Sequence, residues 1–112
     1  MPVEQWSESV VLGELQDDPQ FTDDVSQIVE QCSNNPRLDV LLNFEQVEHL
    51  NSSNLAKLLK LRKLVQITNQ RRLKLCNINA HVWGVFLVTG LDRIFEVAED
   101  LPTGLASFQI EE

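Results

Sequence analysis

Short apolar runs alternate along this chain with longer segments in which apolar residues recur every three or four positions. The runs of strand length cover residues 10–12, 38–44, 73–78 and 95–97. The segments with helical spacing cover residues 21–32, 54–70 and 80–89, with a last helical turn near Pro102. The pattern therefore predicts strands and helices in regular alternation.

Local signals refine these elements. Gly13 is expected to end the first strand, and Gly90 to cap the helix over 80–89, because glycine adopts a left-handed conformation at little cost. The long helix over 54–70 is expected to pack on the sheet through its apolar side chains. These are Leu55, Leu58, Leu59 and Val65.

Strands that alternate with helices indicate an α/β fold with crossover connections. We expect a mixed, mostly parallel sheet of about four to five strands, in a single domain over residues 1–112. In such sheets, binding sites lie beyond the carboxyl ends of the strands. The loop over residues 45–54 follows the strand over 38–44, so it is the predicted site.

Charge is distributed unevenly. The net charge is −8, which argues against a nucleic-acid partner. Residues 49–91 nevertheless contain seven bases and no acid, whereas residues 1–48 contain eleven acids and one base. This basic segment fits two interpretations, a solvated helix face or a surface that steers a charged protein partner.

The sequence has no stretch of about 20 apolar residues that could span a membrane. Its first residues, MPVEQWSES, lack the basic and apolar regions of a secretory signal, so we expect a cytoplasmic protein. Cys32 and Cys76 lie far apart with no metal-ligand spacing around them. We interpret both as reduced, buried thiols.

Catalytic and cofactor patterns are missing from the sequence. His49 and His81 stand in no nucleophile arrangement, and we expect structural roles for both. The acidic pairs at 17–18 and 23–24 lack the alternating ligands and glycine turn of a hard-cation loop. With four glycines, the chain has no phosphate-cradling loop. We therefore expect no enzyme activity, no cofactor and no metal.

The segment Asn51-Ser52-Ser53-Asn54 stands directly before the long helix. Ser and Asn side chains cap helix amides, so these residues could serve only to start the helix. Alternatively, one serine is phosphorylated, because a phosphate would meet free amides at the positive end of the helix dipole. Lys57 lies one turn beyond Ser53 and could reach it. Both interpretations stay open on residue types alone.

Three segments of the chain resemble motifs of the STAS family, whose best-known soluble members are bacterial anti-sigma-factor antagonists. LLNFEQVEHLNSSNL is similar to the family's strand, loop and Asp-Ser-(Ser/Ala)-Gly-Leu motif, with Leu55 as the motif leucine. VTGLDRIF at 88–95 and GEL at 13–15 resemble two further family segments in the right order. The resemblance spans about residues 10–97, and it implies the STAS fold.

The resemblance also implies a function. Such a protein binds a cognate anti-sigma kinase when unphosphorylated, which frees a sigma factor to join RNA polymerase, and the kinase phosphorylates it. The regulated serine falls on Ser53, with Ser52 as second choice. The partner-binding residues are then His49, Asn51, Ser52, Ser53, Asn54 and Lys57.

Asn51 and Asn54 stand where the family motif has Asp and Gly. The alternative is therefore a constitutive STAS subunit of a membrane ABC transporter or of a larger signalling assembly.

Overall fold

The computed structural model of the chain describes residues 3–110, with side chains through residue 108. The first half contains β1 (Val3–Gln5), β2 (Val10–Gln16), α1 (Gln20–Asn34), β3 (Asp39–Gln46) and α2 (Ser52–Arg62). The second half contains η1 (Lys63–Thr68), β4 (Leu73–Cys76), α3 (Ala80–Thr89), η2 (Leu91–Arg93), β5 (Glu96–Ala98) and α4 (Leu101–Ile110).

The described strands form one five-stranded sheet in the order β1-β2-β3-β4-β5. β1 pairs antiparallel with β2, and every later pair is parallel. Each parallel pair is joined through a helix, as the alternating pattern predicts. The expected mixed, mostly parallel α/β fold is confirmed.

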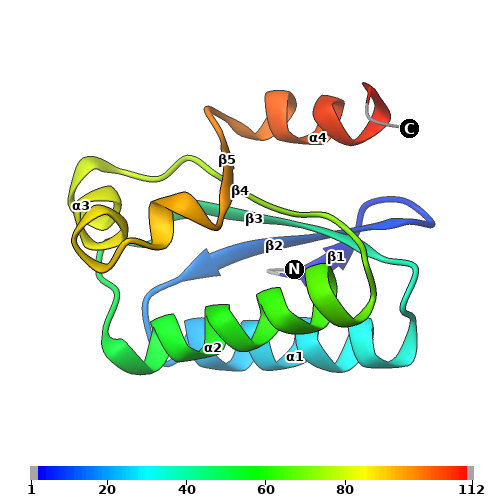
Figure 1. Ribbon diagram of the computed structural model, residues 1–112, viewed down its shortest axis with the longest axis horizontal. Helices are drawn as coiled ribbons and strands as arrows, with labels where there is room; N and C mark the ends of the chain where they lie inside the picture. Colours follow the sequence, from blue (N-terminus) through cyan, green and yellow to red (C-terminus); the bar gives the residue numbers. More distant parts are fainter. Residues whose placement is uncertain (1–2, 111–112) are drawn as a thin grey trace.

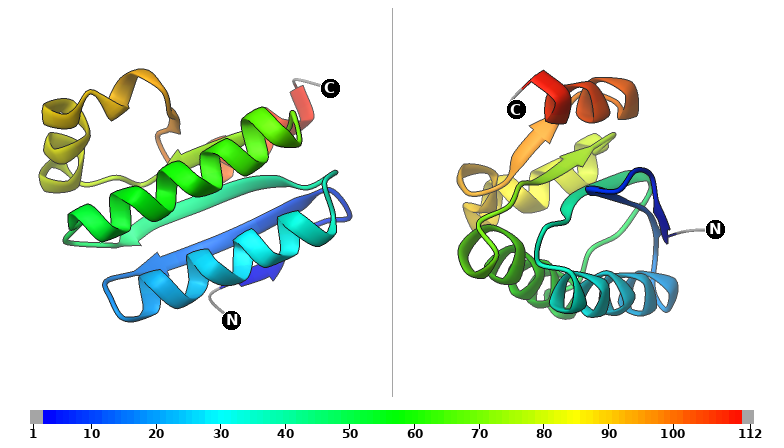
Figure 2. Two further views of the ribbon diagram at one scale, coloured as in Figure 1. Left: turned by 60° about the horizontal axis from the view of Figure 1, so that its bottom comes forward. Right: turned by 90° about the vertical axis from the view of Figure 1, so that its right-hand side faces the viewer.

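The helices cover the sheet on both faces (Figure 1). α1 and α2 lie side by side on one face, and α4 lies on the opposite face (Figure 2). α3 lies near the end of the sheet toward which β2 runs (Figure 1). The loop before α2 and the loop before α1 are at this same end, where the carboxyl ends of the strands meet.

Continuous apolar runs in β2 and β3 reflect burial on both faces of the sheet. Val11 and Leu42 belong to the larger core, beneath α1 and α2. Val10, Leu12 and Leu41 point the other way, into a smaller core with Phe108 of α4. Alternate residues of one strand thus serve two cores, because successive side chains leave opposite faces.

Gly13 does not end the first strand, so that prediction is wrong. β2 continues through it to Gln16. A Cβ atom at residue 13 would lie 2.7 Å from Cδ1 of Ile28 and 3.1 Å from Cδ2 of Leu42. The glycine therefore allows α1 to pack closely on the strand.

The long helix also differs from its prediction. It begins at Ser52 rather than residue 54, and after Arg62 it continues as a π-helix to Thr68. Leu58, Leu61 and Val65 are buried as core residues, but Leu59 is 38% exposed. The prediction that Leu59 packs on the sheet is wrong, because it lies on the outer side of the helix.

The carboxyl-terminal elements agree more closely. α3 has the predicted bounds and is capped by Gly90 in the left-handed region, with φ of 77°. The turn predicted near Pro102 is a full helix, α4, anchored by buried Phe108.

Cys32 and Cys76 are buried free thiols, and burial raises the pKa of each to about 11. Within residues 3–110, no helix is both long and apolar enough to cross a membrane.

Candidate functional site

Ser52 and Ser53 occupy the first two helical positions of α2 and are exposed. They follow the loop that leaves the carboxyl end of β3, as the sequence predicts. The Lys57 ammonium donates a hydrogen bond to Oγ of Ser53, at 3.0 Å. The structure thus places a serine hydroxyl and a cation together on the surface.

Asn51 is the N-cap of α2. Its Oδ1 accepts the backbone N–H of Asn54 at 2.8 Å, and Oδ1 of Asn54 accepts the backbone N–H of Asn51 at 3.1 Å. This reciprocal capping box satisfies two amides at the helix start. The capping role therefore belongs to Asn51 and Asn54, and the two serine side chains are not needed for it.

A residue outside the motif, Asp18 in the loop between β2 and α1, stabilises this capping box through hydrogen bonds. Its Oδ2 accepts hydrogen bonds from the side-chain amides of Asn54 at 2.8 Å and Asn51 at 3.4 Å. Its Oδ1 accepts the hydroxyl and backbone N–H of Thr22. The bonds from Thr22 and Asn54 hold the pKa of Asp18 below its usual value.

Asn54 is only 2% exposed, since its side chain is directed toward Asp18 and the Asn51 amide. Asn54 therefore stabilises the start of α2 through internal hydrogen bonds, and its side-chain amide is not presented to a partner. Of the six residues that the sequence nominated for partner binding, the other five are at least partly exposed. These are His49, Asn51, Ser52, Ser53 and Lys57.

The loop before α2 is held by further bonds. Oδ1 of Asp17 accepts the backbone N–H groups of Glu48 at 2.9 Å and His49 at 3.1 Å. The side-chain amide of Asn79, which caps α3, donates to the carbonyl of Val47 at 3.0 Å. The loop is thus attached to the starts of both neighbouring helices, and Ser53 is presented on a defined surface.

From the sequence alone, Asp17 and Asp18 are considered as a hard-cation loop, which their pattern excludes, and are not connected with the site. A usable signal existed, because they follow β2 as the loop over 45–54 follows β3. The carboxyl ends of adjacent parallel strands meet at one end of a sheet. Two polar segments that follow two such strands were therefore candidates for contact.

The start of α2 suits an anion. The first intrahelical hydrogen bond joins the N–H of Leu55 to the carbonyl of Asn51, so the amides of Ser52 and Ser53 precede it. No residue in the first turn of α2 is acidic, and Lys57 lies one turn along. A phosphate on Ser53 would meet the positive end of the helix dipole and a cation.

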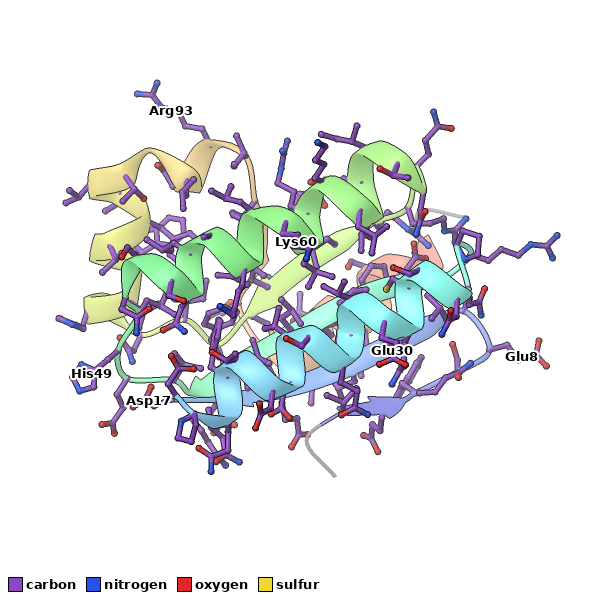
Figure 3. The ribbon with its side chains drawn as sticks, turned by 90° about the horizontal axis from the view of Figure 1, so that it is seen from below. Glu8, Asp17, Glu30, His49, Lys60 and Arg93 are labelled. Atoms are coloured by element: carbon purple, nitrogen blue, oxygen red, sulfur yellow. The ribbon has the colours of Figure 1, made fainter. Side chains whose placement is uncertain are left out.

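An open groove of about 430 Å³ continues from this surface between α1 and α2. Val25 and Val29 of α1 line one side, and Ala56, Lys57 and Lys60 of α2 line the other. Figure 3 shows Lys60 and Glu30 on the face that α1 and α2 share. Lys57 contributes both to this groove and to the contact with Ser53, so the two features form one surface.

Comparison with known proteins shows the family. The STAS domain model matches residues 16–104, and no curated protein sequence matches the chain. An anti-sigma-factor antagonist (STAS) domain protein from Planctomyces limnophilus has a TM-score of 0.75 at 20% identity, with 94% of each chain covered. A stressosome structure, described as a signal integration and transduction hub, has a TM-score of 0.76 at 15% identity, with 96% of each chain covered.

The anti-sigma factor antagonist SpoIIAA is similar in two states. Its unphosphorylated form has a TM-score of 0.69 at 21% identity, covering 97% of this chain and 94% of SpoIIAA. The phosphorylated form, from Bacillus, has a TM-score of 0.61 at 21% identity, with 96% of each chain covered. At these identities the likeness establishes the fold.

Proposed function

The chain belongs to the STAS domain family, and we propose that it is a protein-interaction regulatory module of the anti-sigma-factor antagonist type. Its partner is an anti-sigma kinase, which binds the unphosphorylated protein and phosphorylates Ser53. Binding frees a sigma factor and so regulates transcription in the cytoplasm. The module itself carries out no catalysis.

One observation carries this proposal. Ser53 is exposed at the second position of α2, it is free of any capping duty, and its Oγ lies 3.0 Å from the Lys57 ammonium. Regulation requires a hydroxyl that a kinase can reach and a surrounding surface that the added charge changes. The similar structures of SpoIIAA in unphosphorylated and phosphorylated forms support the same reading.

The partner surface consists of the loop before α2 and the exposed side of that helix. His49, Asn51, Ser52, Ser53 and Lys57 would contact the partner directly. The groove between α1 and α2 extends this surface with apolar walls and two lysines. A phosphate at Ser53 would bring about two negative charges into the interface and weaken binding through desolvation and repulsion.

The test compares Ser53→Asp with Ser53→Ala. A partner captured from the native host is identified by mass spectrometry, which also maps phosphate on Ser52 and Ser53. Ser53→Asp should weaken binding of that partner at least about tenfold, or 1.4 kcal/mol. Ser53→Ala should bind nearly as well as the parent, because it loses only a small hydroxyl.

Two controls exclude trivial explanations. Asp in the first turn of a helix is favourable, so Ser53→Asp should leave the melting temperature unchanged or slightly raised. Thr103→Asp places the same charge in the first turn of α4, on the opposite face of the sheet, and should leave binding unchanged. Parent-like affinity of Ser53→Asp for the kinase would refute the switch.

A second candidate is a constitutive subunit of a larger signalling assembly. The similarity to a stressosome structure favours it. In that case Ser53 carries no phosphate in the cell, and the captured partner is a multi-subunit complex. Mass spectrometry of the same captured material therefore distinguishes the two candidates.

A further inference from the structure

Three side chains with metal-ligating atoms converge beside the loop before α2. They are Asp17, Glu48 and His49, and their ligand atoms all lie within 4.8 Å of one another. Asp17 directly follows β2, whereas the other two come from the loop after β3. Figure 3 shows Asp17 and His49 near one another at one end of the molecule.

A second imidazole lies beside this cluster. His81, in the first turn of α3, has its ring centre 5.7 Å from that of His49. Two imidazoles on one tetrahedral ion have ring centres roughly 5 Å apart, given metal–nitrogen bonds of about 2.0–2.1 Å. His81 is not one of the three clustered residues, but both histidines are exposed, so the His81 ring has room to turn toward the cluster.

The distances also suit one ion. Ligand atoms around a tetrahedral zinc ion lie about 3.4 Å apart, given bonds of about 2.0–2.2 Å to nitrogen and oxygen. Glu48 and His49 are exposed and can close the remaining gap. Asp17 is held in place because its Oδ1 accepts the backbone amides of those two residues. Its other oxygen, Oδ2, is the one that can face an ion.

We propose that Asp17, Glu48, His49 and His81 form a binding site for a divalent first-row transition ion such as Zn²⁺. The donor set decides the class of ion. Mg²⁺ and Ca²⁺ prefer all-oxygen sites, whereas imidazole together with carboxylate suits zinc and its neighbours. Two carboxylates would balance the charge of the ion.

The sequence predicted no metal site, and the reason is separation along the chain. Asp17 and His49 are 32 positions apart, and His81 lies on a third segment. A bound ion would join the start of α3 and the end of β2 to the loop that leads to Ser53. The site shares His49 with the partner surface proposed above, but neither Ser53 nor Lys57 is a ligand, so Zn²⁺ binding requires neither the phosphate nor the kinase.

The experiment titrates untagged protein, freed of metal with EDTA, with Zn²⁺ in a calorimeter. We expect one ion per chain and a higher melting temperature with Zn²⁺ than without it. Co²⁺ should give the visible absorption bands of a tetrahedral site. His49→Gln should weaken Zn²⁺ binding by at least about 100-fold, because loss of even an outer-shell partner costs about 10–100-fold.

Further variants complete the test. His81→Gln and Glu48→Gln should also weaken Zn²⁺ binding, whereas the matched control Glu45→Gln, an exposed acid of the same segment, should not. Absence of stoichiometric Zn²⁺ binding by the parent would overturn the proposal. So would equal affinity of parent and His49→Gln, or equal loss in Glu45→Gln. Kinase binding by the metal-free protein leaves this result unaffected, so the two proposals fail separately.

Discussion

At the scale of single residues, Asp18 contacts both residues that depart from the family motif. The side-chain amides of Asn51 and Asn54 both donate to its Oδ2. A motif Asp at residue 51 would set a carboxylate against this one, and a motif Gly at residue 54 would leave it without its shorter amide contact. The two asparagines are therefore matched to Asp18.

This pairing predicts the effect of restoring the motif residue. Asn51→Asp keeps a good N-cap, but it brings a second carboxylate near Asp18. We expect a loss of roughly 0.5 kcal/mol in the free energy of unfolding at neutral pH, since both groups are exposed and water screens them. Chemical denaturation measures the loss. Adding Asp18→Asn should remove the repulsion, and a double-mutant cycle without coupling would contradict this account.

At the scale of elements, two adjacent leucines of α2 mark its buried face and its exposed face. Leu58 is fully buried, whereas Leu59 is 38% exposed. Leu58→Ala should lower the free energy of unfolding by about 2–5 kcal/mol, because it opens a cavity in the core. Leu59→Ala, the matched control, should cost less than about 1 kcal/mol. Equal losses in urea denaturation would show that the helix is rotated from this position.

Element type was predictable because apolar periodicity follows directly from burial. The alternating runs gave each parallel strand and each crossover helix within a few residues. The wrong predictions concern residues whose position depends on packing against other parts of the fold. A glycine at this point of the sequence is typical of a strand end. In the structure Gly13 instead lies within the strand, where Ile28 of α1 packs closely against it. Leu59 carries no mark that separates it from Leu58, since α2 has apolar residues on more than one side.

The candidate site was predictable only where its residues lie close together in the sequence. The contact between Ser53 and Lys57 could be predicted, because the two residues lie on one helix at a spacing of four residues. Asp17 and Asp18 were missed because their contacts to the motif loop span more than 30 positions. The position of both segments after parallel strands makes such contacts possible, but the strand order that brings the segments together is specified by no local pattern.

At the scale of the whole molecule, a buried carboxylate joins distant parts of the chain. Asp39, at the start of β3, accepts hydrogen bonds from Arg71 and Arg72, and Arg72 also donates to the carbonyl of Phe108 in α4. Burial alone would raise the pKa of Asp39. The arginines outweigh this effect and hold the pKa below its usual value.

This network predicts how stability depends on pH. A lowered pKa in the folded state stabilises the fold above the unfolded value, about 3.9, and the stabilisation is lost as pH falls through the folded pKa. Asp39→Asn should cost about 2–3 kcal/mol at pH 7, below the range for a fully buried pair, because both arginines reach water.

The measurement is urea denaturation between pH 7 and pH 3. The parent should lose more stability on acidification than Asp39→Asn does. Glu30→Gln, an exposed change on α1, should follow the parent within about 0.5 kcal/mol. Identical pH profiles for the parent and Asp39→Asn would show that other carboxylates govern acid unfolding.

The outermost strands, β1 and β5, have three residues each, and each carries an exposed glutamate, Glu4 and Glu96. A long, uncharged sheet edge is a template on which further chains add strands and grow into fibrils. Such short, charged edges offer little of that template. Other chains therefore find little backbone on this sheet with which to pair, and association is left to side-chain surfaces such as the loop before α2 and the exposed side of that helix.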